Sequence, residues 1–430
     1  MLSRRSFLWV SPTAFAFASE AIAQRAQPPA SLPPSIAALE SMTSQVRPIT
    51  NDERLARIEK ARKLMVDQKF GAIVLTGSAS SLYFANLQMG GGERLWALVI
   101  PSKGAPFLVC PAFEEDRARE LLANTPFGKD ALVRIWQEDE SPYVQLIRGL
   151  KDRGITSGRI GIEETAKFVF ADGIAHAGAP AYTVVSATPV TAGCRMIKDA
   201  HEVECLRLAG QATVRVYEAV YRALAEGMTQ RDVTALIQAG YNRVGFPGNA
   251  SLNIGEYTAL PHGSRTPQTI REGTIIMLDD GCRVEGYTSD ITRTFVLGKP
   301  TGKMKSVFEI VQRAQLAALH AAKPGVPNEA VDAAARKVIV EAGYGPGFKY
   351  FTHRVGHGLG MEMHEWNYLV TNNMFGAAGP RLQPGMVFSD EPGIYIKGEF
   401  GIRLEDDMHI TETGAELLTP PSPSLEQPFG

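Results

Sequence analysis

The sequence has little of several features that would place a protein in a class at once. Its 430 residues include only four cysteines, Cys110, Cys194, Cys205 and Cys282, and these show no paired spacing. A disulfide framework needs more cysteine than this, so buried free thiols are expected. The net charge is -2 and no run of lysine or arginine occurs, which excludes an electrostatic surface for nucleic acid.

Long apolar runs and phosphate-binding motifs are also missing. The apolar stretch Phe7–Ala18 covers about a dozen residues and is interrupted by Ser11, Pro12 and Thr13, whereas a membrane-spanning helix needs roughly 20. No membrane span is therefore expected. The run Gly90–Gly92 does not follow a strand–helix pattern, so it predicts a turn and not a nucleotide-binding loop.

The first residues have the pattern of an export signal. Arg4 and Arg5 come directly before the apolar stretch Phe7–Ala18, and Ala21-Ile22-Ala23 offers a cleavage site between small residues. This combination is typical of a twin-arginine signal peptide over residues 1–23 and predicts export to a bacterial periplasm. The alternative is a frayed cytoplasmic N-terminus.

The remaining chain predicts an arm followed by two domains. Its composition, 44% hydrophobic and 21% charged, is that of a soluble globular protein that is long enough for two cores. Residues 24–50 are rich in proline and predict an extended or loosely packed arm. Residues 51–194 alternate strand and helix patterns and predict an α/β domain. Residues 195–430 predict an α+β domain in which long helices pack on a mostly antiparallel sheet.

Apolar runs and helical periodicity give the expected elements. In the first domain a helix begins near Asn51. The expected strands there are 72–75, 95–100, 107–110 and 131–135, and the expected helices 114–123 and 144–153. In the second domain the expected helices are 199–226, 230–244, 303–322 and 328–342.

The stretch Thr274–Leu297 predicts a β-hairpin that carries two aspartates. Two apolar, β-branched segments flank a polar turn that contains glycine. Asp279 and Asp290 are equidistant from a turn centred between Val284 and Glu285, so they would be opposite neighbours with Cβ atoms about 5 Å apart. Like charges this close repel unless a cation or a proton lies between them, which favours a bridging metal.

A second predicted hairpin, over Met386–Thr411, repeats the arrangement with two glutamates. Glu391 and Glu405 are equidistant from Gly398 in the turn, so they would also share one face. Either acidic pair alone would be explained equally well by a surface charge cluster. Two pairs within apolar strands favour a site, because unpaired carboxylates are costly to bury.

A segment rich in histidine and glycine, His353–Glu365, lies between the two hairpins. It holds His353, His357 and His364, three of the eight histidines, and imidazole is the commonest protein metal ligand. Four carboxylates and a histidine suit two divalent ions such as Mn²⁺, Co²⁺ or Zn²⁺. Two ions roughly 3.5–4 Å apart would share a bridging hydroxide and stabilise a tetrahedral oxyanion, which predicts hydrolysis of amides or esters.

As a set, these motifs resemble the pita-bread metallopeptidases, the creatinase and prolidase family of Xaa-Pro aminopeptidases, Xaa-Pro dipeptidases and methionine aminopeptidases. The resemblance is colinear over about residues 50–415. The matching segments are Arg195–Asp199, Leu278–Cys282, Ser289–Thr294, His353–His364, Asp390–Tyr395 and Gly401–Asp407. It implies a C-terminal pita-bread domain preceded by an N-terminal α/β creatinase-type domain.

The resemblance also implies the metal ligands. Asp279 and Asp290 would hold one ion, and His357 and Glu391 the other. Asp290 and Glu405 would bridge the two ions, and Glu391 would also handle the proton of the attacking water. Mn²⁺ is the first expectation for both ions, with Co²⁺ and Zn²⁺ as alternatives.

Four further side chains receive roles through the same resemblance. His262, His353 and His364 would contact the substrate and the tetrahedral intermediate. Arg403, two residues before Glu405 on the same strand, would steady that carboxylate. For His262 an ordinary loop histidine remains a competing interpretation.

The resemblance implies small peptide substrates with proline at the second position, and a homodimer. Proline has no amide hydrogen and a fixed φ, so general peptidases handle it poorly. The choice between an aminopeptidase and a dipeptidase stays open. Two alternatives also remain, a hydrolase of another small amide on the same fold and a creatinase-fold binding protein without turnover, although the complete ligand set argues against the latter.

Overall fold

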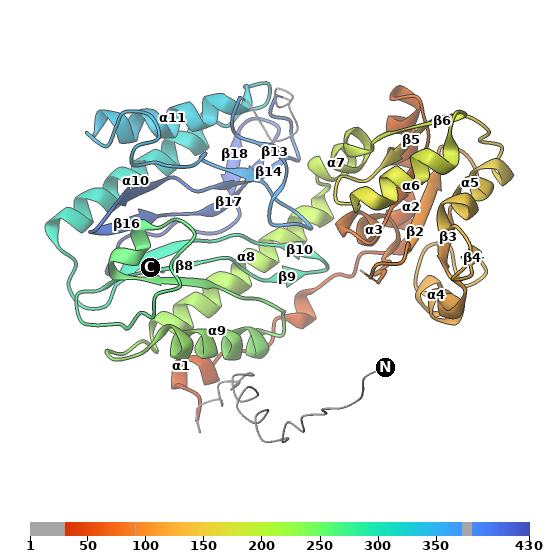
Figure 1. The fold of residues 1–430 in the computed structure, drawn as a ribbon. Helices are drawn as coiled ribbons and strands as arrows, with labels where there is room; N and C mark the ends of the chain where they lie inside the picture. Colours follow the sequence, from red (N-terminus) through yellow and green to blue (C-terminus); the bar gives the residue numbers. More distant parts are fainter. Residues whose placement is uncertain (1–30, 91, 372–380) are drawn as a thin grey trace, which may run out of the picture.

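A computed structural model of the chain describes residues 31–90, 92–371 and 381–430 (Figure 1). The expected signal peptide, residues 1–23, and the start of the expected arm, residues 24–30, lie outside this part. Two bodies lie side by side, an N-terminal sheet with helices against it and a larger C-terminal body of long helices and antiparallel strands. The long helix α8 (Ala200–Tyr221) begins where they meet.

The N-terminal body is built on a six-stranded mixed sheet. The strand order is β4-β3-β2-β1-β5-β6, with β1 parallel to β5 and antiparallel to β2. The strands are β1 (Phe70–Leu75), β2 (Ala97–Pro101), β3 (Phe107–Pro111), β4 (Leu132–Trp136), β5 (Gly158–Ile162) and β6 (Tyr182–Ser186). The helices are α2 (Asn51–Asp67), α3 (Ala79–Ala85), α4 (Glu115–Ala123), α5 (Pro142–Asp152), α6 (Phe168–Gly178) and α7 (Thr188–Met196).

The C-terminal body combines long helices with short antiparallel strands. Its other helices are α9 (Gln230–Val244), α10 (Gly302–Ala321) and α11 (Asn328–Glu341). One sheet has the order β11-β8-β7 and another β13-β12-β14-β17-β18, and β9 pairs with β10 and β15 with β16. The strands are β7 (Ser251–Ile254), β8 (Ile275–Asp279), β9 (Arg283–Val284), β10 (Tyr287–Thr288), β11 (Arg293–Val296), β12 (His357–Gly358), β13 (Glu365–Tyr368), β14 (Val387–Asp390), β15 (Gly393–Ile396), β16 (Phe400–Arg403), β17 (Asp406–Ile410) and β18 (Ala415–Leu417).

Helix pairs cover the strands of the C-terminal body with two apolar cores. Val216 of α8 shares one core with Leu278 of β8, and Phe308 of α10 shares the other with Phe388 of β14. The α+β arrangement predicted for this half is therefore confirmed. The predicted helices begin and end within two residues of the observed ones, except that α8 ends at Tyr221 and not at Glu226.

The two predicted hairpins exist, and the register of the second is as predicted. Ile396 pairs with Phe400 and Asp390 with Asp406, which centres the turn on Gly398. Glu391 and Glu405 therefore lie opposite each other, in the interruptions between β14 and β15 and between β16 and β17.

The predicted register of the first hairpin is wrong. Val284 pairs with Tyr287, so the turn is centred between Glu285 and Gly286 and not one position earlier. Both turn residues have positive φ, 49° and 91°, as a tight two-residue hairpin turn requires. In this register Thr292, and not Asp290, faces Asp279. The side-chain period is two residues, so the shifted pairing still leaves both aspartates on one face.

Residues 31–50, here called the docked arm, are more ordered than the expected loosely packed segment. The helix α1 (Pro34–Ala37) contacts α8 and α9, and Ile36 and Met42 are buried. The backbone N–H of Ile49 then donates to Glu285 in the β9–β10 turn (3.0 Å). Order therefore begins before Asn51, because the apolar residues between the prolines cover a helical surface.

All four cysteines are buried and carry free thiols. Within residues 31–90, 92–371 and 381–430, no helix has both the length and the apolar character that a bilayer crossing demands.

Candidate metal centre

The aspartates of the first hairpin come from the ends of β-structure. Asp279 is the last residue of β8, where Thr292 Oγ1 donates to its Oδ1 (2.7 Å). Asp290 lies between β10 and β11, and its backbone N–H donates to Asp407 (3.2 Å). Burial of the Asp290 side chain is almost complete, at 6% exposed. Hydrogen bonds therefore fix the carboxylate of Asp279 and the backbone of Asp290.

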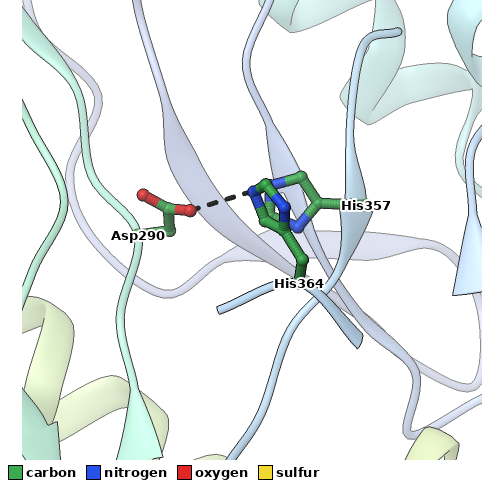
Figure 2. Close-up of side chains that lie close together, drawn as sticks. All are labelled: Asp290, His357 and His364. Carbon is green, nitrogen blue, oxygen red and sulfur yellow. Dashed lines mark ion pairs between the residues drawn. The ribbon is translucent and has the colours of Figure 1, made fainter. Parts of the chain in front are cut away.

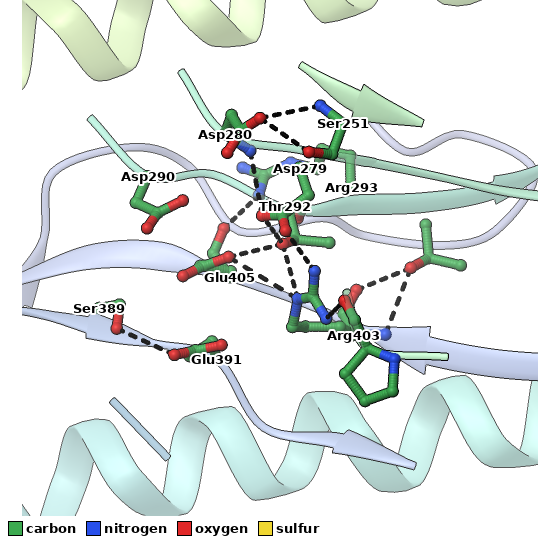
Figure 3. A network of polar contacts seen from close by, with 12 residues as sticks. Ser251, Asp279, Asp280, Asp290, Thr292, Arg293, Ser389, Glu391, Arg403 and Glu405 are labelled. Carbon is green, nitrogen blue, oxygen red and sulfur yellow. Dashed lines mark hydrogen bonds and ion pairs between the residues drawn. The ribbon is translucent and has the colours of Figure 1, made fainter. Parts of the chain in front are cut away.

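The glutamates of the second hairpin approach from the opposite sheet. The backbone N–H of Glu405 donates to the carbonyl of Thr292 (3.2 Å), which ties the second hairpin directly to the first. The N–H of Glu391 donates to Val355 (2.8 Å), just before the histidine segment. Main-chain bonds between elements that are far apart in sequence thus bring the two acidic pairs together. Figure 3 shows the four carboxylates in one region between the two hairpins.

His357 supplies a nitrogen to this group of carboxylates. Its Nδ1 lies 3.1 Å from the carbonyl oxygen of Gly358, which can only accept, so Nδ1 carries the hydrogen. Nε2 is then a lone-pair acceptor, 3.5 Å from Glu391 and 3.7 Å from Asp290. His364 lies against His357 with ring centroids 3.9 Å apart, and both rings face Asp290 (Figure 2).

Three overlapping sets of donor atoms lie close enough to hold metal ions. In each set the ligand atoms lie within 4.8 Å of one another. The sets are Asp279 with Asp290 and Glu405, His357 with Glu391 and Glu405, and Asp290 with His357 and His364. All five predicted ligands are therefore brought together, and His364 joins them.

The cluster fits cations because its carboxylate oxygens and its imidazole nitrogen, which are all hydrogen-bond acceptors, face one another. Burial raises the pKa of Asp290 and of Glu405 well above the usual range, and neighbouring carboxylates raise both further. Burial likewise raises the pKa of Glu391 to about 8. The lone pair of His357 points at these groups and brings no hydrogen. Divalent ions would satisfy all of these atoms at once.

Thr292 and Arg403 connect the two acidic pairs (Figure 3). Oγ1 of Thr292 lies 2.7 Å from Asp279 and 2.5 Å from Glu405, and it accepts from Nε of Arg403 (3.0 Å). Arg403 was predicted to steady Glu405, but that pair is 3.9 Å apart, whereas Arg403 donates directly to Asp279. Burial opposes ionisation of Asp279, yet Arg403 lowers its pKa below the usual value.

Tyr395 orients His353, a role that sequence reasoning missed. Nδ1 of His353 donates to the carbonyl of Arg354 (2.8 Å), so its Nε2 accepts from the hydroxyl of Tyr395 (2.7 Å). That hydroxyl in turn accepts from Arg403 (2.9 Å). Burial and the Arg403 charge lower the pKa of His353 to about 3, so the ring stays neutral. The only sequence signal was the place of Tyr395 on the strand after Glu391.

The remaining predicted histidines lie at the edge of the cluster. His353 Nδ1 is 3.7 Å from Glu391, and His353 belongs to none of the three candidate ligand sets. His262 is exposed, in the turn after Pro261, whose carbonyl accepts from Arg403 (3.3 Å). Burial lowers the pKa of His364, and Arg354 and then His262 lower it further.

Known proteins resemble this chain both in sequence and in the arrangement of its domains. Residues 57–197 match the model of the creatinase/prolidase N-terminal domain, and residues 204–412 match metallopeptidase family M24. The probable dipeptidase PepE of Mycobacterium tuberculosis is 35% identical over 367 residues, covering 84% of this chain and 92% of the relative. The putative dipeptidase YkvY of Bacillus subtilis is 33% identical over 367 residues, covering 84% and 97%.

Solved structures agree with these sequence matches. Dipeptidase PepE from Mycobacterium ulcerans superposes with a TM-score of 0.79 at 31% identity, covering 88% of this chain and 99% of that one. An Xaa-Pro dipeptidase from Bacillus anthracis superposes with a TM-score of 0.72 at 28% identity, covering 85% and 98%. The chain thus belongs to metallopeptidase family M24, which implies divalent metal ions, and in this chain a creatinase-type domain precedes the pita-bread catalytic domain.

Proposed function

We propose that this protein hydrolyses Xaa-Pro bonds in small peptides with the help of two divalent metal ions. The observation that carries the proposal is the convergence of four carboxylates and one imidazole, all acceptors and all buried or partly buried, in overlapping sets between two hairpins. The names of its relatives support the substrate class, since they include probable dipeptidases, an Xaa-Pro dipeptidase and an X-Pro aminopeptidase from Thermotoga maritima.

We propose that the cluster holds two ions, Mn²⁺ first, with Co²⁺ or Zn²⁺ as alternatives. Asp279 and Asp290 would hold one ion, His357 and Glu391 the other, and Asp290 and Glu405 would bridge. When bound, such a pair polarises the substrate carbonyl and lowers the pKa of an attacking water.

The side chains around the ligands would handle the substrate and the protons. Glu391 takes a proton from the attacking water and returns it to the leaving proline nitrogen. His364 and His262 contact the substrate from the open side, and His353, oriented by Tyr395, contacts it from the Glu391 side. A proline nitrogen has no hydrogen to donate, so selection would depend on the shape of the ring.

The direct test is an assay of purified protein with added Mn²⁺ on an Xaa-Pro dipeptide and an Xaa-Pro-Xaa tripeptide. Cleavage of the dipeptide alone would identify a dipeptidase, and cleavage of the tripeptide an aminopeptidase. Asp290→Ala should abolish turnover while circular dichroism stays native. The proposal fails if the wild type binds metal stoichiometrically yet cleaves neither peptide.

We also propose that the protein is exported and acts as a homodimer. Export rests on the pair Arg4-Arg5 and the apolar stretch that follows, so a double Arg4→Lys, Arg5→Lys variant should remain in the cytoplasm of a bacterial host. Sedimentation of the purified protein tests the dimer, and a monomer with full activity would contradict it.

A further inference from the structure

A cluster of buried charges lies where the two bodies meet, outside the metal centre. Arg195 lies in the last turn of α7 and Lys198 follows that helix, whereas Glu365 is the first residue of β13. Nζ of Lys198 is 3.1 Å from one oxygen of Glu365, and Nε of Arg195 is 3.3 Å from the other. These three side chains are at most 5% exposed. Arg195 also donates to Glu362, in the loop before β13.

Glu365 holds together the loop that carries His364. Its Oε1 accepts the backbone N–H of Met361 (3.0 Å) and of Glu362 (3.3 Å). The loop wraps so tightly that a Cβ at Gly360 would lie 2.8 Å from Oε2 of Glu365. The carboxylate is therefore the centre around which the loop is folded.

The same residue is next to both histidines of the metal centre. Glu365 follows His364 directly, and across the β12–β13 pair it faces Gly358, the neighbour of His357. A displacement of Glu365 would therefore move both imidazoles.

The cluster forms a stiff anchor, and part of it belongs to the N-terminal body. The carboxylate of Glu365 lies between the ammonium of Lys198 and the guanidinium of Arg195, and all three side chains are buried. Breaking a buried ion pair leaves an unpaired charge, so such contacts resist movement. Arg195 also donates to Oγ of Ser80 on α3 (3.0 Å), and this bond links the anchor to the N-terminal body.

We propose that Arg195 and Lys198 are positioning residues that hold Glu365, and through it His364 and His357, in place at the metal centre. The N-terminal body thereby contributes to the geometry of a site that contains none of its own ligands. The expected effect on turnover rests on the function proposed above, whereas the expected effect on the loop does not.

Lys198→Met in the full chain tests the anchor, with Lys198→Arg as the conservative rescue. Lys60→Met is a matched control, because Lys60 also holds this junction, through the carbonyls of Cys194 and Ile197, but bonds to no group of the loop. Hydrogen exchange of segment 356–368 should accelerate in Lys198→Met and not in Lys198→Arg or Lys60→Met. Equal exchange in all variants, or equal acceleration in Lys60→Met, would overturn the proposal.

Kinetics separate positioning from general damage. In Lys198→Met kcat should fall about 10- to 100-fold with KM little changed and metal content intact. In a His364→Ala background the same change should cost less than in the wild type, because the part of its effect that acts through His364 is already lost and only the part through His357 remains. Fully additive losses contradict the proposal.

Should Lys198→Met fail to fold, Glu365→Gln, which keeps the shape of the side chain and weakens its ion pairs, must show the same pattern. A wild type without peptidase activity refutes the proposed function, and the exchange measurement still decides on the anchor.

Discussion

At the scale of single residues, Thr292 links the two halves of the metal centre. Its one hydroxyl hydrogen lies between Asp279 and Glu405, while its oxygen accepts from Arg403. A hydroxyl can donate to one acceptor at a time, so the two carboxylates share this donor. Thr292 therefore sets their spacing without itself being among the predicted ligands.

Replacing Thr292 by valine keeps the shape and removes the shared hydrogen bond. Metal affinity or kcat should fall about 10- to 100-fold, the usual cost of losing a partner of metal ligands. Titration of the apoprotein with Mn²⁺ and steady-state kinetics measure the two effects. Thr191→Val is the control, because Thr191 is buried in α7 and bonds to Glu164 instead. Equal losses in both variants would contradict the role of Thr292.

The side chain of Glu53 makes folding sensitive to acid. Burial opposes its ionisation, but hydrogen bonds from His201 and Thr50 prevail and lower its pKa from 4.5 to about 2. A carboxylate with a depressed folded pKa stabilises the fold above the unfolded value and loses that contribution as pH falls. Wild type should therefore exceed Glu53→Gln in unfolding free energy at pH 7, and the difference should shrink between pH 4.5 and pH 2. Urea denaturation at several pH values measures this, and a constant difference contradicts it.

At the scale of elements, the two hairpins explain why much of the metal centre could be predicted from the sequence. In a hairpin, residues at equal distance from the turn lie opposite each other, so the sequence predicts that each acidic pair shares one face. The turn of the first hairpin was misplaced by one position because Glu285 occupies a positive φ more typical of glycine or asparagine. Asp279 and Asp290 still share one face, as predicted, because moving the turn by one position shifts each pairing by two residues, an even number.

The rest of the site depended on contacts between distant segments. Thr292 meets Glu405 across 113 residues, and Lys198 meets Glu365 across 167. No local pattern specifies such pairings, so Thr292, Tyr395 and Lys198 gave no signal beyond their place in a motif. Strand β5 was missed for a local reason, because Gly158, Arg159 and Gly161 break its apolar run.

Helix α9 offers a test of an element that lies away from the site. Thr229 caps it, accepting from the N–H of Asp232 (3.3 Å), whose carboxylate accepts from the Thr229 N–H in return (2.8 Å). Thr229→Ala should lower the unfolding free energy by about 1 kcal/mol. Urea denaturation measures this loss of unfolding free energy, and kcat should stay at the wild-type value. A stability unchanged within error would show that the cap contributes nothing.

At the scale of the whole molecule, metal binding and folding should be linked. The buried carboxylates repel one another when no cation is present, so ions that bind only the folded chain stabilise it. Mn²⁺ at 100 times its Kd should add about 2.7 kcal/mol per site to the unfolding free energy, and chelation should remove it. Thermal melting with EDTA and then Mn²⁺ tests this, and Asp290→Ala should lose most of the response. A melting temperature indifferent to Mn²⁺ would contradict the linkage.

The docked arm imposes an order of events during synthesis. Ser35 bonds to Ala219, 184 residues later, and Ile49 bonds to Glu285, 236 residues later. The intervening sheet domain can complete its own pairing on the ribosome long before those acceptors have been translated. The earliest segment of the described chain must therefore wait as an unpartnered apolar stretch until well over half of the protein has emerged, and in that interval it is open to chaperones and proteases.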